Sequence, residues 1–166
     1  LTVEPDQTRR HFRLVASDFP HGQTLPVEVV WESSNGVPLP PLYLAITTPP
    51  ALNAEITPRG QSNLGLAMPV QVSFSEPLAD RDGASRYIPV RTRDGRDIAG
   101  KWRWIDKTKL QFTPQPGWPA STQIEVSLDR RGIRSVQGGR LDEVAPSTFG
   151  TGTDRKIVVY LDAQRA

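Results

Sequence analysis

Hydrophobic and polar residues alternate along much of the chain, most clearly between Gly100 and Pro114. Successive side chains of a β-strand point to opposite faces, so this pattern predicts two half-buried strands. A polar break at residues 105–108 separates them and predicts a hairpin turn. Two tryptophans on one face predict the centre of a hydrophobic core. The inward residues are predicted to be Trp102, Trp104, Leu110 and Phe112, and the outward residues Lys101, Arg103, Lys109 and Gln111.

The same kind of pattern predicts further strands and turns. An Asp94-Gly95 turn predicts a second hairpin, and Asp80 is the predicted N-cap of one helical turn at residues 80–85. A long glycine-rich stretch covers residues 132–152. No convincing amphipathic helix is predicted, so the expected fold is an all-β sandwich over about residues 52–151, with additional N-terminal strands. The further strands are predicted at residues 11–15, 26–31, 42–46, 54–58, 70–74, 87–93, 98–104, 123–128 and 156–161.

Turn-forming residues predict three parts along the chain. Residues 1–51 contain strands that belong either to a preceding domain or to an extension of the next one. Consecutive prolines at residues 47–50 predict a linker, because proline fixes φ and cannot continue a strand ladder. Residues 52–152 are the predicted sandwich, and residues 153–166 are a predicted linker followed by a final strand.

Composition limits the classes of function. Among 166 residues there are 13 glycines and 16 prolines, which is above the usual share of about 12% and predicts frequent turns. The net charge of +2 is too small to imply binding of a polyanion such as a nucleic acid. Residues 86–109 carry eight basic and three acidic side chains. We interpret this local excess as the solvated face of a sheet, because edge strands use charge to discourage pairing.

Membrane and export signals are absent from the sequence. No apolar run approaches the roughly 20 residues of a membrane helix, and the N-terminus lacks the regions of a signal peptide. Because the first residue is Leu1 and not methionine, we interpret the chain as one from which such a segment has been trimmed.

Residues that carry catalytic chemistry are scarce. The chain has no cysteine, which excludes disulfides, thiolate nucleophiles and the common zinc sites, and its two histidines are His11 and His21. Asp80-x-Asp82-Gly83 lacks the further oxygen ligands of a calcium loop, so a capped turn is the preferred interpretation. Nothing in the sequence places two carboxylates across a substrate; the candidates are Glu55, Glu76, Asp80 and Asp82. We therefore predict no catalytic residue, no metal site and no cofactor.

Surface contacts are the remaining possibility. The run Lys101 to Trp104 could be a stacking platform for a sugar or a base, but the alternation favours tryptophans in the core and cations outside. Trp118 lies between Gly117 and Pro119 in a predicted turn, which makes it the better candidate for an exposed ring, although a ring that caps the sandwich is the commoner arrangement. The candidate surface-contact residues are Lys101, Arg103, Lys109 and Trp118.

Several segments occur together in the order of a known family. The most specific are FSEPLADR at residues 74–81, a W-x-W strand followed by L-x-F-x-P, and PGWPAST at residues 116–122. Over about residues 56–166 the chain resembles the bacterial immunoglobulin-like domain that precedes the catalytic domain of actinobacterial L,D-transpeptidases. Segments 69–81, 88–90, 100–104, 110–114, 118–122 and 148–152 carry this resemblance.

The resemblance implies an immunoglobulin-like β-sandwich that is itself non-catalytic. It also implies that residues 153–166 are a linker and the first strand leading to a catalytic domain that this chain lacks. In that family the following domain uses a cysteine nucleophile and a nearby histidine to form 3→3 cross-links in peptidoglycan, and this chain contains no cysteine. The implied role is a spacer in an exported, extracytoplasmic cell-envelope protein, with membrane attachment through an anchor outside this chain. The implied partners are its own downstream catalytic domain and peptidoglycan or another wall polymer, without nucleic acid.

Two other functions stay open from the sequence. The domain could be a binding module, in which Trp118 and the basic face of Lys101, Arg103 and Lys109 hold wall glycan, a teichoic-type polymer or a partner protein. It could also be an immunoglobulin-like segment of another surface protein, such as an adhesin or a bacterial macroglobulin.

Overall fold

The computed structural model describes residues 2–5, 12–15 and 20–154. The chain forms two compact units. Unit 1 comprises residues 1–51 and 137–139, and unit 2 comprises residues 52–136 and 140–166. The predicted strand at residues 156–161 and the candidate His11 lie outside the described residues.

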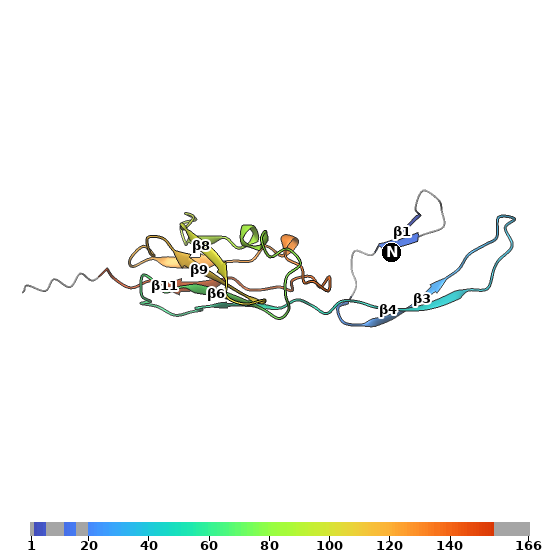
Figure 1. The fold of residues 1–166 in the computed structure, drawn as a ribbon, viewed down its shortest axis with the longest axis horizontal. Helices are drawn as coiled ribbons and strands as arrows, with labels where there is room; N and C mark the ends of the chain where they lie inside the picture. Colours follow the sequence, from blue (N-terminus) through green and yellow to red (C-terminus); the bar gives the residue numbers. More distant parts are fainter. Residues whose placement is uncertain (1, 6–11, 16–19, 155–166) are drawn as a thin grey trace, which may run out of the picture. The chain divides into compact units, whose positions relative to one another are not determined.

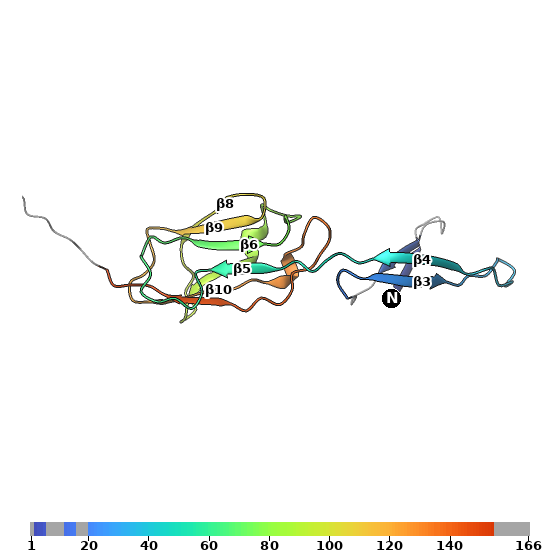
Figure 2. The same cartoon turned by 90° about the horizontal axis from the view of Figure 1, so that it is seen from below.

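Unit 2 is a sandwich of two antiparallel sheets, which confirms the predicted fold class. The four-stranded sheet has the order β5 (Ala54–Thr57), β6 (Val70–Phe74), β9 (Lys109–Pro114) and β8 (Gly100–Trp104). The three-stranded sheet has the order β11 (Ser147–Gly150), β10 (Gln123–Val126) and β7 (Val90–Thr92). Figure 2 shows β8, β9, β6 and β5 side by side.

The core fills the space between the two sheets. Every second residue of β6, β9 and β10 is buried, as the alternation predicts. A row of aromatic rings crosses this core, in which Phe112 lies 5.0 Å from Trp102 and 5.7 Å from Trp118, and Trp118 lies 5.3 Å from Phe149 between ring centroids. Each fully buried large apolar side chain stabilises the fold by about 1.5–3 kcal/mol. The largest fully buried apolar residues are Phe149, Leu52, Ile88, Leu110, Ile124, Ile133, Val70, Val72 and Val126.

The predicted hairpin at residues 100–114 is present as β8 and β9, with Trp102 opposite Phe112 and Trp104 opposite Leu110. The prediction that both tryptophans mark the centre of the core is wrong, because each is only half-buried. The reason is that β8 is an edge strand. The centre of the core lies instead under the inner strands β6 and β9, whose inward side chains are buried.

The second predicted hairpin needs a correction. A tight turn does form at residues 94–95, where Thr92 N donates to Arg96 O and Ile98 N donates to Val90 O, both at 2.9 Å. However, β7 extends only over residues 90–92, and the chain then crosses so that β8 joins the opposite sheet. Strand alternation reports local exposure, and it does not tell which sheet a strand joins.

Two short 3₁₀ turns and one strand also differ from prediction. The first turn is η1 (Ala84–Tyr87), which starts after Gly83; Asp80 does not cap it but accepts a hydrogen bond from Gly83 N at 2.8 Å. The second is η2 (Arg130–Gly132), whose N-cap is Asp129. The strand β11 was not predicted, because it lies within the glycine-rich stretch at residues 132–152.

Unit 1 consists of two hairpins among its described residues. In the first, β1 (Thr2–Pro5), which was not predicted, pairs with β2 (Phe12–Val15). In the second, β3 (Thr24–Val29) pairs with β4 (Leu42–Thr47). The predicted linker at residues 47–50 is partly ordered, because Thr48 is buried and its Oγ1 donates to Pro20 O at 2.7 Å.

The chain enters and leaves unit 2 at opposite ends of the sandwich (Figures 1 and 2). Leu52 forms a parallel bridge with Leu141 where the chain enters, and Leu64 forms a parallel bridge with Thr151 where the last strand finishes. The segments 52–64 and 141–151 therefore run in the same direction. Ten residues of extended chain span at most about 33 Å, which is the upper limit for the distance between the two ends.

Candidate interaction faces

The outer face of the four-stranded sheet presents three cations. Lys101 and Arg103 come from β8 and Lys109 comes from β9, and all three side chains are exposed, as the alternation predicts. Strand register places Arg103, Gln111, Gln71 and Thr57 in one row across all four strands. We call Lys101, Arg103, Lys109, Gln111 and Gln71 the cationic face.

The three cations of this face make no ion pair with any residue that the structure describes. Elsewhere on unit 2 three exposed arginines are paired: Arg91 with Asp97 at 2.7 Å, Arg96 with Asp94 at 3.0 Å and Arg131 with Asp129 at 3.0 Å, whereas Arg93 has no ion pair with a described residue. The three cations of the cationic face therefore lack a direct ion pair with the described residues, whereas Arg91 and Arg96, in and next to β7, each have one.

The acidic residue closest in sequence to the cationic face is Asp106. Its carboxylate accepts from Thr108 N at 2.7 Å and from Lys109 N at 2.8 Å. The hydrogen bond from the Thr108 backbone is the main cause of the lowered pKa of Asp106, and the charge of Lys109 is a smaller one. Asp106 is thus held by its own turn.

Trp118, the candidate for an exposed ring, is buried. It is 3% exposed, and its Nε1 donates to Met68 O at 2.6 Å. Its ring lies between Phe112 and Phe149, so it joins the inner faces of the two sheets. The flanking Gly117 and Pro119 indicated a turn correctly, but the partners that bury the ring are distant in sequence. The ring is therefore a core residue and leaves the cationic face without an aromatic platform.

The other candidate carboxylates do not converge. Asp80 accepts a hydrogen bond from Gly83 N, Glu55 is exposed on the edge strand β5, and Oε2 of Glu76 is buried without a hydrogen-bond partner. In the described part of the chain no three His, Asp or Glu side chains are placed to hold a metal ion. Over the same residues no helix is both long and apolar enough to cross a membrane.

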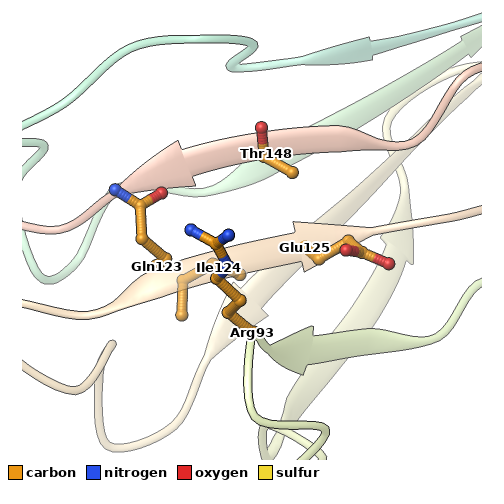
Figure 3. A pocket seen from close by; sticks show the side chains of 5 residues that line it. All are labelled: Arg93, Gln123, Ile124, Glu125 and Thr148. Atoms are coloured by element: carbon orange, nitrogen blue, oxygen red, sulfur yellow. The ribbon is translucent and has the colours of Figure 1, made fainter.

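A shallow cavity of about 330 Å³ lies on the three-stranded sheet (Figure 3). Arg93, at the end of β7, extends toward Gln123 and Ile124 of β10, while Glu125 and Thr148 lie further along the neighbouring strands. Sequence reasoning missed this cavity, because its walls come from three segments that only the sheet register brings together. Opposite charges line it, so it has no single preference for an anion or a cation.

A second hollow, of about 470 Å³, is lined by residues 78–82 and Trp104. Arg81 lies over the Trp104 ring, and Trp104 Nε1 donates to Arg81 O at 3.0 Å. The FSEPLADR segment therefore packs against the W-x-W strand, which gives both motifs a structural role.

Residues 45–134, more than half of the chain, match the bacterial Ig domain family. The chain belongs to this family. Its sandwich agrees with this assignment, and the matched region includes all strands of this bacterial Ig domain from β5 to β10.

The chain is also similar to parts of several curated proteins. The bacterial Ig domain is 33% identical over 78 residues to probable L,D-transpeptidase 3 of Mycobacterium tuberculosis, covering 45% of this chain and 28% of that protein. It is 28% identical over 75 residues to L,D-transpeptidase 1 of the same species, covering 45% and 29%. A macroglobulin of Pasteurella multocida, alpha-2-macroglobulin, is 29% identical over 63 residues, covering 38% of this chain and 3% of that protein. The chain thus spans less than a third of the length of these relatives.

Among solved structures, the crystal structure of L,D-transpeptidase 3 from Mycobacterium tuberculosis has a TM-score of 0.43 and 30% identity, covering 61% of this chain and 37% of that one. An L,D-transpeptidase from Mycobacterium smegmatis has a TM-score of 0.45 and 29% identity, covering 61% and 40%.

Proposed function

We propose that this bacterial Ig domain is a non-catalytic spacer module of an extracytoplasmic, cell-envelope L,D-transpeptidase-like protein that takes part in peptidoglycan cross-linking. In this role it positions a catalytic domain within the wall. The curated relatives support the proposal, because two of them are named L,D-transpeptidases and the chain covers 28% and 29% of their length. The partner of the module is then the catalytic domain of the same protein.

The position of the two chain ends carries the proposal. A spacer must connect its neighbours in series, which requires that the chain enter and leave at opposite ends of the domain. Unit 2 has this arrangement, since Leu52 pairs with Leu141 at one end and Leu64 pairs with Thr151 at the other. A domain whose two ends lay side by side would hold its neighbours next to each other instead.

Rigidity at the departing end also fits a spacer. Thr151 Oγ1 donates to Pro119 O at 2.6 Å and accepts from Thr122 N at 2.9 Å. One residue further, Gly152 N donates to Leu64 O at 2.8 Å. The chain is therefore held up to Gly152. A core packed at the density of a solid transmits this rigidity through the sandwich.

The proposal is tested in the full-length parent protein by replacing residues 52–152 with a Gly/Ser linker of equal residue number. We expect unchanged turnover of soluble muropeptides by the purified enzyme but fewer 3→3 cross-links in the wall, because a flexible chain no longer fixes the distance. The matched control replaces the same residues with an unrelated rigid β-sandwich and should retain the cross-links. Unchanged cross-linking with the flexible linker, or turnover by residues 1–166 alone, would contradict the proposal.

A second candidate is an immunoglobulin-like segment of another bacterial surface protein, which the match to alpha-2-macroglobulin favours. Its sequence context separates it from the spacer. Further immunoglobulin-like repeats after this domain in the parent gene favour the second candidate, whereas a cysteine-containing catalytic domain favours the spacer.

A further inference from the structure

The three cations of the cationic face form an evenly spaced series. Lys101 and Arg103 are two residues apart on one strand, which separates them by about 7 Å. Ile105 N donates to Lys109 O at 2.8 Å, so Lys109 lies opposite Ile105, which is two residues beyond Arg103 along the chain. Lys109 lies on the neighbouring strand β9, so the diagonal distance from Arg103 to Lys109 is about 8 Å. The series therefore runs obliquely across β8 and β9.

Protection of the sheet edge accounts for only part of this charge. Lys101 and Arg103 lie on the edge strand β8, where charge discourages strand addition. Lys109 lies on β9, which is hydrogen-bonded on both sides and has no edge to protect. Burial and charge pairing do not explain it either, since Lys109 is exposed and has no ion pair among the described residues.

Neutral hydrogen-bonding side chains lie next to the three cations. Gln111 and Gln71 lie next to Arg103 in the same row and offer amide donors and acceptors. The acidic groups nearby are Asp106, which is occupied by its turn, and Glu55, which is two strands from Lys109 across Ser73. The face therefore combines a line of cations with neutral hydrogen-bonding groups.

We propose that the cationic face binds an extended polyol-phosphate chain of the cell envelope. Six single bonds join successive phosphorus atoms of a glycerol-phosphate chain, and six extended backbone bonds span about 7 Å, which matches the step between the cations. Arginine binds a phosphate through two parallel hydrogen bonds and lysine binds it as a point charge. The glutamine side-chain amides form hydrogen bonds with the hydroxyl and ester oxygens between the phosphates.

The test measures binding of purified poly(glycerol phosphate) to the full chain at 50 mM NaCl. The variant K101Q/R103Q/K109Q removes the series, and R91Q/R93Q/R96Q removes the same charge from the other sheet. We expect the native chain and the second variant to bind alike, and the first variant to bind at least tenfold more weakly. Three phosphate contacts also predict a loss of about tenfold in native affinity between 50 and 150 mM salt.

Three outcomes overturn the inference: absence of saturable binding by the native chain, equal loss in both variants, or equally tight binding of poly-glutamate, which has carboxylates in place of phosphates. Circular dichroism confirms that each variant is folded, as expected for exposed substitutions. The inference goes beyond the spacer role and does not require it. A face that binds no polymer leaves the linker-replacement experiment unaffected.

Discussion

The guanidinium of Arg81 lies over the indole ring of Trp104, with Cζ 4.6 Å from the ring centroid. Trp104 Nε1 in turn donates to Arg81 O at 3.0 Å, and Arg81 Nη2 donates to Asp106 O at 2.9 Å. One arginine thus connects the loop after β6, the edge strand β8 and the turn that follows it. Because β8 has a neighbour on one side only, these contacts replace part of the support that an inner strand receives.

This relationship predicts an energetic coupling between Arg81 and Trp104. We expect Arg81→Met and Trp104→Leu each to lower the free energy of unfolding by about 1–3 kcal/mol, because each removes a hydrogen bond and the cation–ring contact. The double variant should lose about 1 kcal/mol less than the sum of the single variants. Urea unfolding of all four proteins measures the coupling. Strict additivity would show that the stacking contributes nothing.

Local alternation predicted the strands that have a clear inside and outside, and it predicted that Lys101, Arg103 and Lys109 face solvent. It did not predict the burial of Trp118, because the hydrogen-bond acceptor at Met68 and the ring of Phe149 are distant in sequence. The passage from β7 to β8 was missed for a related reason, since sheet membership depends on pairing with distant strands. The role of the cations as a contact surface stays a prediction.

Gly100 begins β8 at a position where a larger residue does not fit. A Cβ atom there would overlap the ring of Phe112 and would lie 2.6 Å from Thr113 O. We therefore expect Gly100→Ala to lower the free energy of unfolding by about 1–3 kcal/mol, because Phe112 belongs to the core and cannot move freely. Gly65 has no atom near the position of its Cβ, so Gly65→Ala should change stability by less than about 1 kcal/mol. Equal stability of both variants in chemical denaturation would contradict this account.

The burial of Trp118 predicts that truncation of its side chain destabilises the fold, as expected for a core residue and not for a ligand-binding ring. We expect Trp118→Ala to cost about 3–5 kcal/mol, because it leaves a cavity between Phe112 and Phe149. Trp118→Phe keeps much of the packing but removes the hydrogen bond to Met68 O, at a cost of about 1–2 kcal/mol. Trp31 is 50% exposed in unit 1 and provides the control, since Trp31→Phe should leave the unfolding of unit 2 unchanged. A Trp118→Ala variant with native stability would place the ring outside the core.

The hydrogen bonds to the Asp106 carboxylate predict that the free energy of unfolding falls at acidic pH. Its pKa is lowered from 3.8, chiefly by the hydrogen bond from the Thr108 backbone, so the folded state favours the carboxylate. The resulting stabilisation is fully present above pH 3.8 and is lost as the pH falls through the folded-state pKa. We therefore expect Asp106→Asn to be less stable than the native chain at pH 7, and the difference to shrink below pH 3.8. Urea unfolding at several pH values measures this, with Asp82→Asn as control, because Asp82 is exposed and accepts no hydrogen bond from the described residues. A difference that stays constant down to pH 2.5 would show that the Asp106 carboxylate is not what stabilises the turn.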